Sequence, residues 1–448
     1  MGFDKLIALW TRVRDSLWFV PALLTVAYAA LAFGTVSLDR AGLLANAADG
    51  RWLFGGTASG ARGVLTAIAS GYITVTGVVF SVTIVALQLA STQFTPRILR
   101  NFTADRANQV VLGVFIGTFT YSLLVLRVIR AQEDAPAGGA APAEAFVPNL
   151  SVTVSLALAV VGIGFLIFFI DHAARSVQAS VIIDRVTGTT LDTLDRRLPS
   201  TVGAPAAESP TDVTPRAHGS IVEARKSGYI EGVDADALTR LLRHDKLTVR
   251  MERDVGDFVL PGTTLAVVWP AGLADGDVAE TIRKAFILGP QRTPHLDVEL
   301  GLIELVDIAV KALSPGINDP TTATLCVDRI VEVLVEYGRR DPPARVRRDP
   351  DGHGILILPR LEFDHLVELG FTQIRHYGSG DARFCATLLH RLEHLGTLLP
   401  SGRTRPVARQ AAALVREACV RIEEPGDRKA VVRAGRQTLR ALGVGSRS

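Results

Sequence analysis

Four long stretches in the first 170 residues contain no acidic or basic side chain, and they limit the fold more than any other feature. A helix needs about 20 mostly apolar residues to cross the hydrocarbon core of a bilayer. We therefore expect transmembrane helices at residues 17–36, 63–95, 110–126 and 152–170. The second stretch is longer than a bilayer requires. Pro96 disfavours helix at Thr95, so we expect that helix to end there.

Charged residues are concentrated in the rest of the chain, which indicates a membrane domain joined to a soluble domain. The predicted fold class is an α-helical membrane domain of four transmembrane helices plus a cytoplasmic α/β domain, mostly helical towards the C-terminus. With 48 Lys and Arg against 45 Asp and Glu, the net charge of +3 provides no global basic field. Nucleic acid is therefore not an expected partner.

Basic residues near the ends of the expected spans predict the orientation, because cytoplasmic loops carry an excess of Lys and Arg. Eight lie on the side that holds both termini, and five lie on the other side. We expect a multi-pass protein of the inner (plasma) membrane with both termini in the cytoplasm. The Ala-, Pro- and Gly-rich segment at residues 135–142 is then an external loop.

The soluble part reads as a short α/β region followed by a series of helices. Strands are expected at residues 220–224 and 246–251, with a helix between them. Gly256 to Leu265 resembles a turn of biotinyl and lipoyl-type domains, but it offers no lysine for attachment and is interpreted as a tight β-turn. The expected organisation is a transmembrane domain at 1–172, a stalk helix and linker at 173–219, a β-rich α/β subdomain at 220–270 and a mainly helical subdomain at 271–448.

The most distinctive motifs lie around the expected helix at residues 296–313 and at the end of the second span. They are Arg292-Thr293, Asp297, Leu305 to Ala309, Ala312 to Pro315, Ile317 to Thr322, and Leu87 to Arg97. Together they resemble the family of predicted bacterial membrane proteins known as domain-of-unknown-function family twenty-two fifty-four. The resemblance covers most of the chain. It implies a membrane location, and it brings no activity, cofactor or catalytic residue.

Polar residues of these motifs form a candidate cytoplasmic corner. The side-chain oxygens of Ser, Asn and Asp residues beside a helix N-terminus could hold a cation or a small polar ligand. The alternative is a capped corner between two packed helices. Asp319 is the expected N-cap of the following helix, with Pro320 at its first position. The candidate residues are Arg292, Asp297, Asp307, Ser314, Asn318 and Asp319.

The second span carries a stripe of small and polar residues near one helix face. Such a stripe can let helices pack closely, or it can line a wet path for ions. The pore-lining candidates are Thr66, Ser70, Thr74, Gly77, Ser81 and Gln88. Gly113 and Gly117 form a G-x-x-x-G pattern in the third span, which predicts close packing. No charged residue lies deep in a span, which argues against a proton-driven transporter.

One motif weakly suggests an enzyme. His390, Glu393 and His394 fit the H-x-x-E-H pattern of inverted zinc peptidases, and Glu417 is the one candidate for a further ligand. Leu388, Leu392 and Leu395 form the expected core stripe of the same helix, which would turn both histidines towards solvent. We interpret the match as chance and expect no metal, no cofactor and no catalytic residue. Cys326, Cys385 and Cys419 form no C-x-x-C pattern and are expected to be free thiols.

The sequence favours a homo-oligomeric ion channel or pore, with the second span as lining and the cytoplasmic domain for assembly and gating. The expected partners are the lipid bilayer, further copies of the chain, and an ion or small-molecule ligand. The alternative is a membrane-anchored cytoplasmic ligand sensor or scaffold without a conducting pore. A membrane-associated hydrolase is a third, less favoured alternative.

Overall fold

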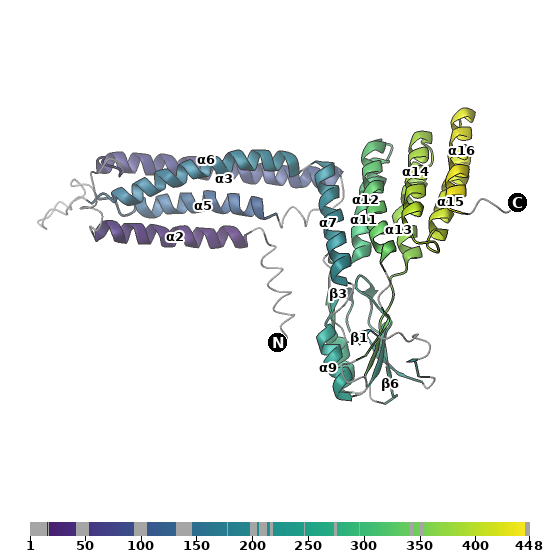
Figure 1. The fold of residues 1–448 in the computed structure, drawn as a ribbon. Helices are drawn as coiled ribbons and strands as arrows, with labels where there is room; N and C mark the ends of the chain where they lie inside the picture. Colours follow the sequence, from purple (N-terminus) through teal and green to yellow (C-terminus); the bar gives the residue numbers. More distant parts are fainter. Residues whose placement is uncertain are drawn as a thin grey trace, which may run out of the picture. The chain divides into compact units, whose positions relative to one another are not determined.

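The structure is a computed structural model that divides into two compact units, residues 1–178 and 179–448 (Figure 1). We call them the N-terminal unit and the C-terminal unit. The predicted helix end at Thr95 and the predicted external loop lie outside the described residues. The structure describes residues 16, 18–41, 53–93, 105–130, 146–176, 178–197, 204–205, 213–215, 218–245, 247–272, 276–294, 296–340, 344–348 and 354–443.

The N-terminal unit is a bundle of helices built from the four apolar stretches. All four are long and apolar enough to cross a membrane, as the sequence predicts. The second has 36 residues and is about 54 Å long at 1.5 Å per residue, against a hydrocarbon core of about 30 Å. The helices are α2 (Phe19–Arg40), α3 (Ala58–Gln93), α5 (Arg106–Leu126) and α6 (Asn149–Ser176).

Helix α5 is the centre of this bundle and packs against α2, α3 and α6. Close approach to α2 depends on two glycines. A Cβ at Gly113 would lie 2.5 Å from the Leu24 side chain, and one at Gly117 would lie 2.7 Å from the Tyr28 ring. The close packing predicted from the G-x-x-x-G pattern is therefore confirmed.

At the start of α6, the Asp39 carboxylate accepts hydrogen bonds from the backbone N–H groups of residues 150 and 151, both at 3.0 Å.

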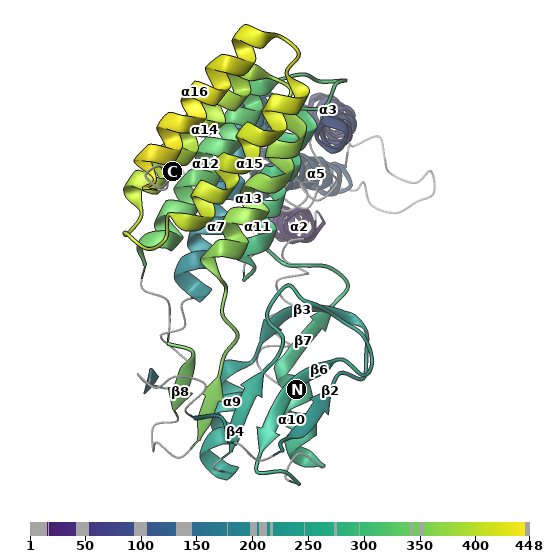
Figure 2. The ribbon, with the colours of Figure 1, turned by 90° about the vertical axis from the view of Figure 1, so that its right-hand side faces the viewer.

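The C-terminal unit contains an array of helices in which neighbours in the chain pack side by side (Figure 2). α7 packs on α11 and α12, and the last helix, α16, packs on α14 and α15. Most of these helices lie in residues 271–448, where a mainly helical subdomain was predicted. The helices of the array are α7 (Ala179–Arg197), α11 (Val298–Ala312), α12 (Pro320–Arg339), α13 (Phe363–Gly378), α14 (Ala382–Leu398), α15 (Arg405–Arg421) and α16 (Pro425–Ala441).

Helix α7 differs from the expected continuous stalk. α6 ends at Ser176 and α7 begins at Ala179, so two separate helices stand where one was expected. The apolar stripe of α7, including Ile183 and Leu194, is buried within the helical array. The apolar stripe that predicted a stalk helix therefore packs α7 against the other helices of the array.

The remaining elements of the C-terminal unit form two sheets with helices against them. The larger sheet has the order β1-β8-β9-β4-β6-β2, and the smaller has the order β5-β3-β7. All pairs are antiparallel except β4 with β9. The elements are β1 (Ala204–Pro205), β2 (Ser220–Glu223), β3 (Gly228–Val233), α9 (Ala235–Asp245), β4 (Thr248–Met251), β5 (Phe258–Val259), β6 (Thr264–Trp269), α10 (Asp277–Ala285), β7 (Phe286–Gly289), β8 (Val346–Arg348) and β9 (Ile355–Ile357).

Two strands of the smaller sheet, β3 and β7, were not expected. Their apolar residues pack into one core with those of the larger sheet, including Ile230 and Phe286. The larger sheet also takes strands from outside residues 220–270, because β8 and β9 return from the helical region to pair with β4. These pairings join segments that are far apart in the sequence.

Candidate functional site

The pore-lining candidates all lie on one exposed face of α3. Each of the six is exposed in the single chain. At about 100° of rotation per residue, they fall within a sector of roughly 80°. The Thr74 hydroxyl donates to the Ser70 carbonyl at 2.8 Å, so this side chain is satisfied by its own helix. The face therefore combines hydroxyls, glycine and one amide at Gln88.

The opposite face of α3 packs against the rest of the bundle. Leu65, Ala69, Val79 and Thr83 are each 5% exposed or less. The centre of this buried face lies roughly 140° from the polar face by the same rotation. The Thr83 hydroxyl donates to the Val79 carbonyl at 2.8 Å, so it is satisfied inside the bundle. Within one chain, the polar row points outwards together with exposed apolar residues of α3 such as Ile73, Val78 and Val85.

The glycines of α3 are not used for packing within the described part of the chain. A Cβ at Gly63, Gly71 or Gly77 would meet no described heavy atom within 4 Å. This contrasts with Gly113 and Gly117 of α5, where a Cβ would collide with α2. Helix packing in membranes favours small residues at interfaces. Gly77, on the polar face, thus leaves open space there, whereas Gly71 lines a small pocket shared with α5 and α6.

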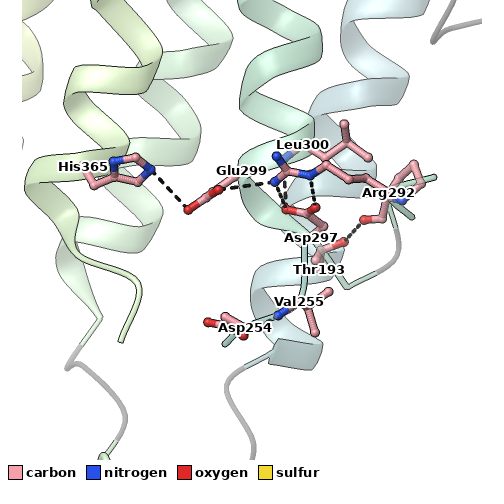
Figure 3. A network of polar contacts seen from close by, with 9 residues as sticks. Thr193, Asp254, Val255, Arg292, Asp297, Glu299, Leu300 and His365 are labelled. Carbon is pink, nitrogen blue, oxygen red and sulfur yellow. Dashed lines mark hydrogen bonds and ion pairs between the residues drawn. The ribbon is translucent and has the colours of Figure 1, made fainter. Parts of the chain in front are cut away.

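In the C-terminal unit, the predicted residues Arg292 and Asp297 meet at the start of α11 (Figure 3). The Arg292 guanidinium donates to both Asp297 oxygens, at 2.6 Å from Nε and 2.8 Å from Nη2. Asp297 is also the N-cap of α11, because its Oδ1 accepts from the Leu300 N–H at 3.1 Å. Its side chain has 0% exposure. A bidentate pair of this kind is geometrically specific and strong.

Two further residues extend this pair into what we call the arginine cluster: Arg292, Asp297, Glu299 and His365. Nη2 of Arg292 also reaches Glu299 at 3.3 Å, and Glu299 lies 3.3 Å from His365 of α13. Burial disfavours the charged form of Arg292. The hydrogen bonds and charges of the two carboxylates outweigh burial, so the pKa of Arg292 is raised. The guanidinium is thus held charged.

A glycine in a neighbouring turn makes room for the cluster. Gly256 has φ +96°, in the region that favours glycine. A Cβ there would lie 2.5 Å from Asp297 Oδ2 and 2.8 Å from Arg292 Nη2. The backbone at Gly256 therefore lies close to the buried Arg292–Asp297 ion pair, where a side chain would not fit. Gly262 in the same turn also has a left-handed φ, which agrees with the interpretation of residues 256–265 as a tight turn. Because the acids are already bonded to Arg292, the cluster is suited to holding α11 in place.

Three other corner candidates, Ser314, Asn318 and Asp319, follow the far end of α11. The Ser314 hydroxyl donates to the Lys311 carbonyl at 2.6 Å, and Asn318 adopts a left-handed φ of 52°. Asp319 caps α12, accepting from the Thr322 N–H at 3.0 Å and from its hydroxyl at 2.6 Å. These bonds, the hydroxyl first, lower the pKa of Asp319. The predicted N-cap and the proline at the first helical turn are confirmed.

The predicted corner is thus two separate sites. Helix α11 has 15 residues and is about 22 Å long, with Asp297 before its start and Ser314 after its end. Asp307 lies part-way along the helix and is half-buried. The six residues do not converge on one ligand, and the turn at residues 314–319 has the geometry of a capped connection.

The H-x-x-E-H residues of α14 are arranged as a surface feature. Leu388, Leu392 and Leu395 are buried, as predicted, and both His390 and His394 are exposed. Among the described residues, no group of three or more His, Cys, Asp or Glu side chains is placed to hold a metal ion. The Glu417 carboxylate is bonded to Arg375 on α13.

The three cysteines are free thiols. Cys326 and Cys385 are buried, whereas Cys419 is half-buried. Burial, with a smaller contribution from nearby Asp381, raises the pKa of Cys385 to about 12. Burial raises the pKa of Cys326 as well. These two thiols are therefore protonated and inert in the folded protein.

Comparison with known proteins places these features in a family. A family profile described as "Predicted membrane protein (DUF2254)" matches residues 14–394. The chain belongs to this family. It is 36% identical to an uncharacterised protein of Mycobacterium bovis over 387 residues, which are 85% of this chain and 73% of that protein. A relative from Mycobacterium tuberculosis matches with the same identity and coverage. No solved structure matches the chain significantly.

The family match confirms the resemblance found from the motifs at both ends of α11 and in α3. The matched residues include the polar face of α3 and the arginine cluster. They end within α14, so α15 and α16 lie outside the DUF2254 profile. The family description supports a membrane protein and assigns no reaction.

Three residues of the arginine cluster region were missed by sequence reasoning. Glu299 has a local signal, because it is an acid in the first turn of a helix, where negative charge is favoured. His365 and Gly256 come from elements far from α11 in the sequence. Only the folded chain brings them beside Asp297, so single-sequence patterns offer no signal for them.

Proposed function

We propose that this DUF2254 protein is a homo-oligomeric pore in which α3 of each copy faces a shared aqueous axis. The observation that carries the proposal is the outward orientation of the polar face of α3. Polar side chains are less favourable against lipid than against water, and a wet axis would supply water to this face. Copies arranged around an axis would place Ser70, Ser81 and Gln88 along that path.

The membrane helices of one chain offer no comparable internal route among the described residues. α5 fills the centre of the N-terminal unit, and it packs closely against α2 through Gly113 and Gly117. Its contacts with α3 and α6 close the remaining sides. An ion path through one chain would have to cross this packed centre, so the outer face of α3 is the better lining.

The proposal includes an inner-membrane location with both termini and the C-terminal unit in the cytoplasm. The bias of Lys and Arg between loops supports this orientation. The test is labelling of an introduced cysteine, Ala137→Cys, in intact cells with a membrane-impermeant thiol reagent. Labelling from outside is expected. Labelling from the cytoplasmic side alone would contradict the orientation.

The conduction test compares two single substitutions on opposite faces of α3. Gln88 carries the bulkiest polar side chain of the exposed face and lies near the end of the helix. Purified protein would be placed in planar bilayers under a voltage ramp with several salts. We expect Gln88→Ala to change conductance or ion selectivity. Thr83→Ala, on the buried face, is the matched control and is expected to leave both unchanged.

The oligomeric state provides an independent measurement. The mass of the protein in lipid discs should correspond to several copies with cyclic symmetry, because such symmetry closes a ring around one axis. A monomer, together with no current above the empty bilayer in any salt, would refute the pore. That result would favour the alternative of a membrane-anchored sensor or scaffold.

A further inference from the structure

The last helix of the chain carries a row of cations along an open groove of about 1110 Å³. α16 supplies most of the lining, and Cys419 of α15 lies on the other side. Five of the lining residues are basic and none is acidic. The lining residues are Cys419, Arg428, Lys429, Val432, Arg433, Arg436, Gln437 and Arg440.

These cations differ from three arginines that join neighbouring helices of the C-terminal unit through ion pairs. Arg375 pairs with a glutamate of α15, Arg391 pairs with an aspartate of α12, and Arg409 pairs with an aspartate of α13. In the groove, Arg428 interacts with the Glu424 carboxylate near the start of α16. The other four basic residues of the groove have no ion-pair partner in the described part of the chain.

The arrangement is unfavourable for an isolated helix. Lys429 and Arg433 are four residues apart, as are Arg436 and Arg440, and like charges at this spacing repel each other. Arg428 and Lys429 also lie near the N-terminus of α16, where the helix dipole disfavours positive charge. A bound anion would relieve both effects. The groove is therefore a site whose charge is complementary to an anionic ligand.

We propose that the α15–α16 groove binds a soluble anion that carries two or more phosphate groups. Arginine presents a planar fork that matches phosphate oxygens, and four of the five cations are arginines. Lys429 and Arg440 are separated by about 16 Å along the helix, at 1.5 Å per residue, so one phosphate cannot engage the whole row. Val432 and Cys419 also line the groove and are half-buried, a position better suited to a compact soluble anion than to a flat bilayer surface.

Binding is tested on the full-length protein in non-ionic detergent by calorimetric titration with inorganic triphosphate. The double substitution Arg433→Gln with Arg436→Gln removes two exposed cations from the groove. Triphosphate binding should weaken roughly tenfold or more, because charge-assisted bonds are lost. The matched control, Lys226→Gln with Arg253→Gln, removes the same charge from exposed positions of the sheet region. It should bind as the unchanged protein does.

Cys419 gives a second measurement that does not depend on heat of binding. Its rate of modification by a thiol reagent should fall when triphosphate is present, because the anion covers the groove. The fall should be absent in the Arg433 and Arg436 double variant. Cys326 and Cys385 are buried and provide no competing signal in the folded protein.

Anionic vesicles separate the two sources of phosphate. Protein in lipid discs is mixed with phosphatidylglycerol vesicles and, separately, with triphosphate. Protection of Cys419 by triphosphate supports the proposal. Protection by vesicles alone overturns it in favour of a lipid-binding surface. Equal weakening of triphosphate binding by the groove and control variants also overturns it, because binding would then follow net charge. None of these outcomes depends on whether the protein conducts ions.

Discussion

Replacement of Asp297 by alanine should be among the most destabilising single changes in the C-terminal unit. The side chain is fully buried, holds two bonds from Arg292 and caps the start of α11. Alanine removes the cap acceptor of the Leu300 N–H. It also leaves the Arg292 guanidinium, which is 20% exposed, with only the longer contact to Glu299.

The magnitude follows from these two losses. Loss of an N-cap costs about 1 kcal/mol. Breaking a buried ion pair by removing one partner costs about 3–5 kcal/mol. Because Arg292 retains Glu299 and some water, we expect the ion-pair loss to lie at its lower end, so the total is about 4 kcal/mol. For a unit of this size, 1 kcal/mol corresponds to roughly 2–4 °C, so the melting temperature should fall by about 8–16 °C. Asp297→Asn keeps a cap acceptor and should cost less.

The buried cysteines provide the assay. A fluorogenic thiol reagent reports unfolding of the helical array when Cys326 and Cys385 become exposed on heating. The half-buried Cys419 is replaced by serine in every variant to remove background. The expected order of melting temperatures is unchanged protein, Asp297→Asn, then Asp297→Ala. If Asp297→Ala melts within about 1 °C of the unchanged protein, the buried pair does not stabilise α11 and our reasoning is refuted.

Two further predictions concern packing and capping. Gly117→Leu should unfold the N-terminal unit at lower temperature, because a side chain there collides with Tyr28, whereas Gly77→Leu should leave the melting of one chain unchanged and disturb only assembly; equal effects on melting would contradict this. Asp319→Ala should cost about 1 kcal/mol at neutral pH. Because hydrogen bonds from Thr322 lower the pKa of Asp319 below its ordinary 3.8, this stabilisation is present above pH 3.8 and is lost as the pH falls through the lower folded value. The gap between the melting curves should therefore narrow as the pH falls below 3.8, and a gap that stays constant through acid denaturation would contradict the assignment.

Local patterns in the sequence were sufficient for the helices. Continuous apolar stretches without charge predicted all four membrane-length helices, and α3 spans Ala58–Gln93 where residues 63–95 were expected. The Asp319 cap and the leucine stripe of α14 depend on residues within one or two turns. Such features are determined by neighbours in the chain, so one sequence reveals them.

Features that depend on distant residues were not accessible in the same way. β3 and β7 pair through Val233 and Phe286, which are more than fifty residues apart, and their short apolar runs have no period that separates strand from helix. The arginine cluster combines α11 with the turn at Gly256 and with His365 of α13. The expected helix at residues 296–313 already separates Asp297 from Ser314, whereas the contacts that link Arg292, Glu299 and His365 required the fold.

The outer face of α3 is the part of the molecule that one chain leaves unexplained. The buried face accounts for the position of the helix in the bundle, since Leu65, Val79 and Thr83 supply its contacts. A helix that faced only lipid on its other side would gain from large apolar residues there. The exposed side of α3 does carry such residues, including Ile73, Val78 and Ile84, and it also carries a row of hydroxyls, glycine and Gln88. Small residues admit a close neighbour, and polar ones are better placed beside water or another copy of the chain than beside lipid. Several copies of the chain around one axis would meet both needs with the same surface.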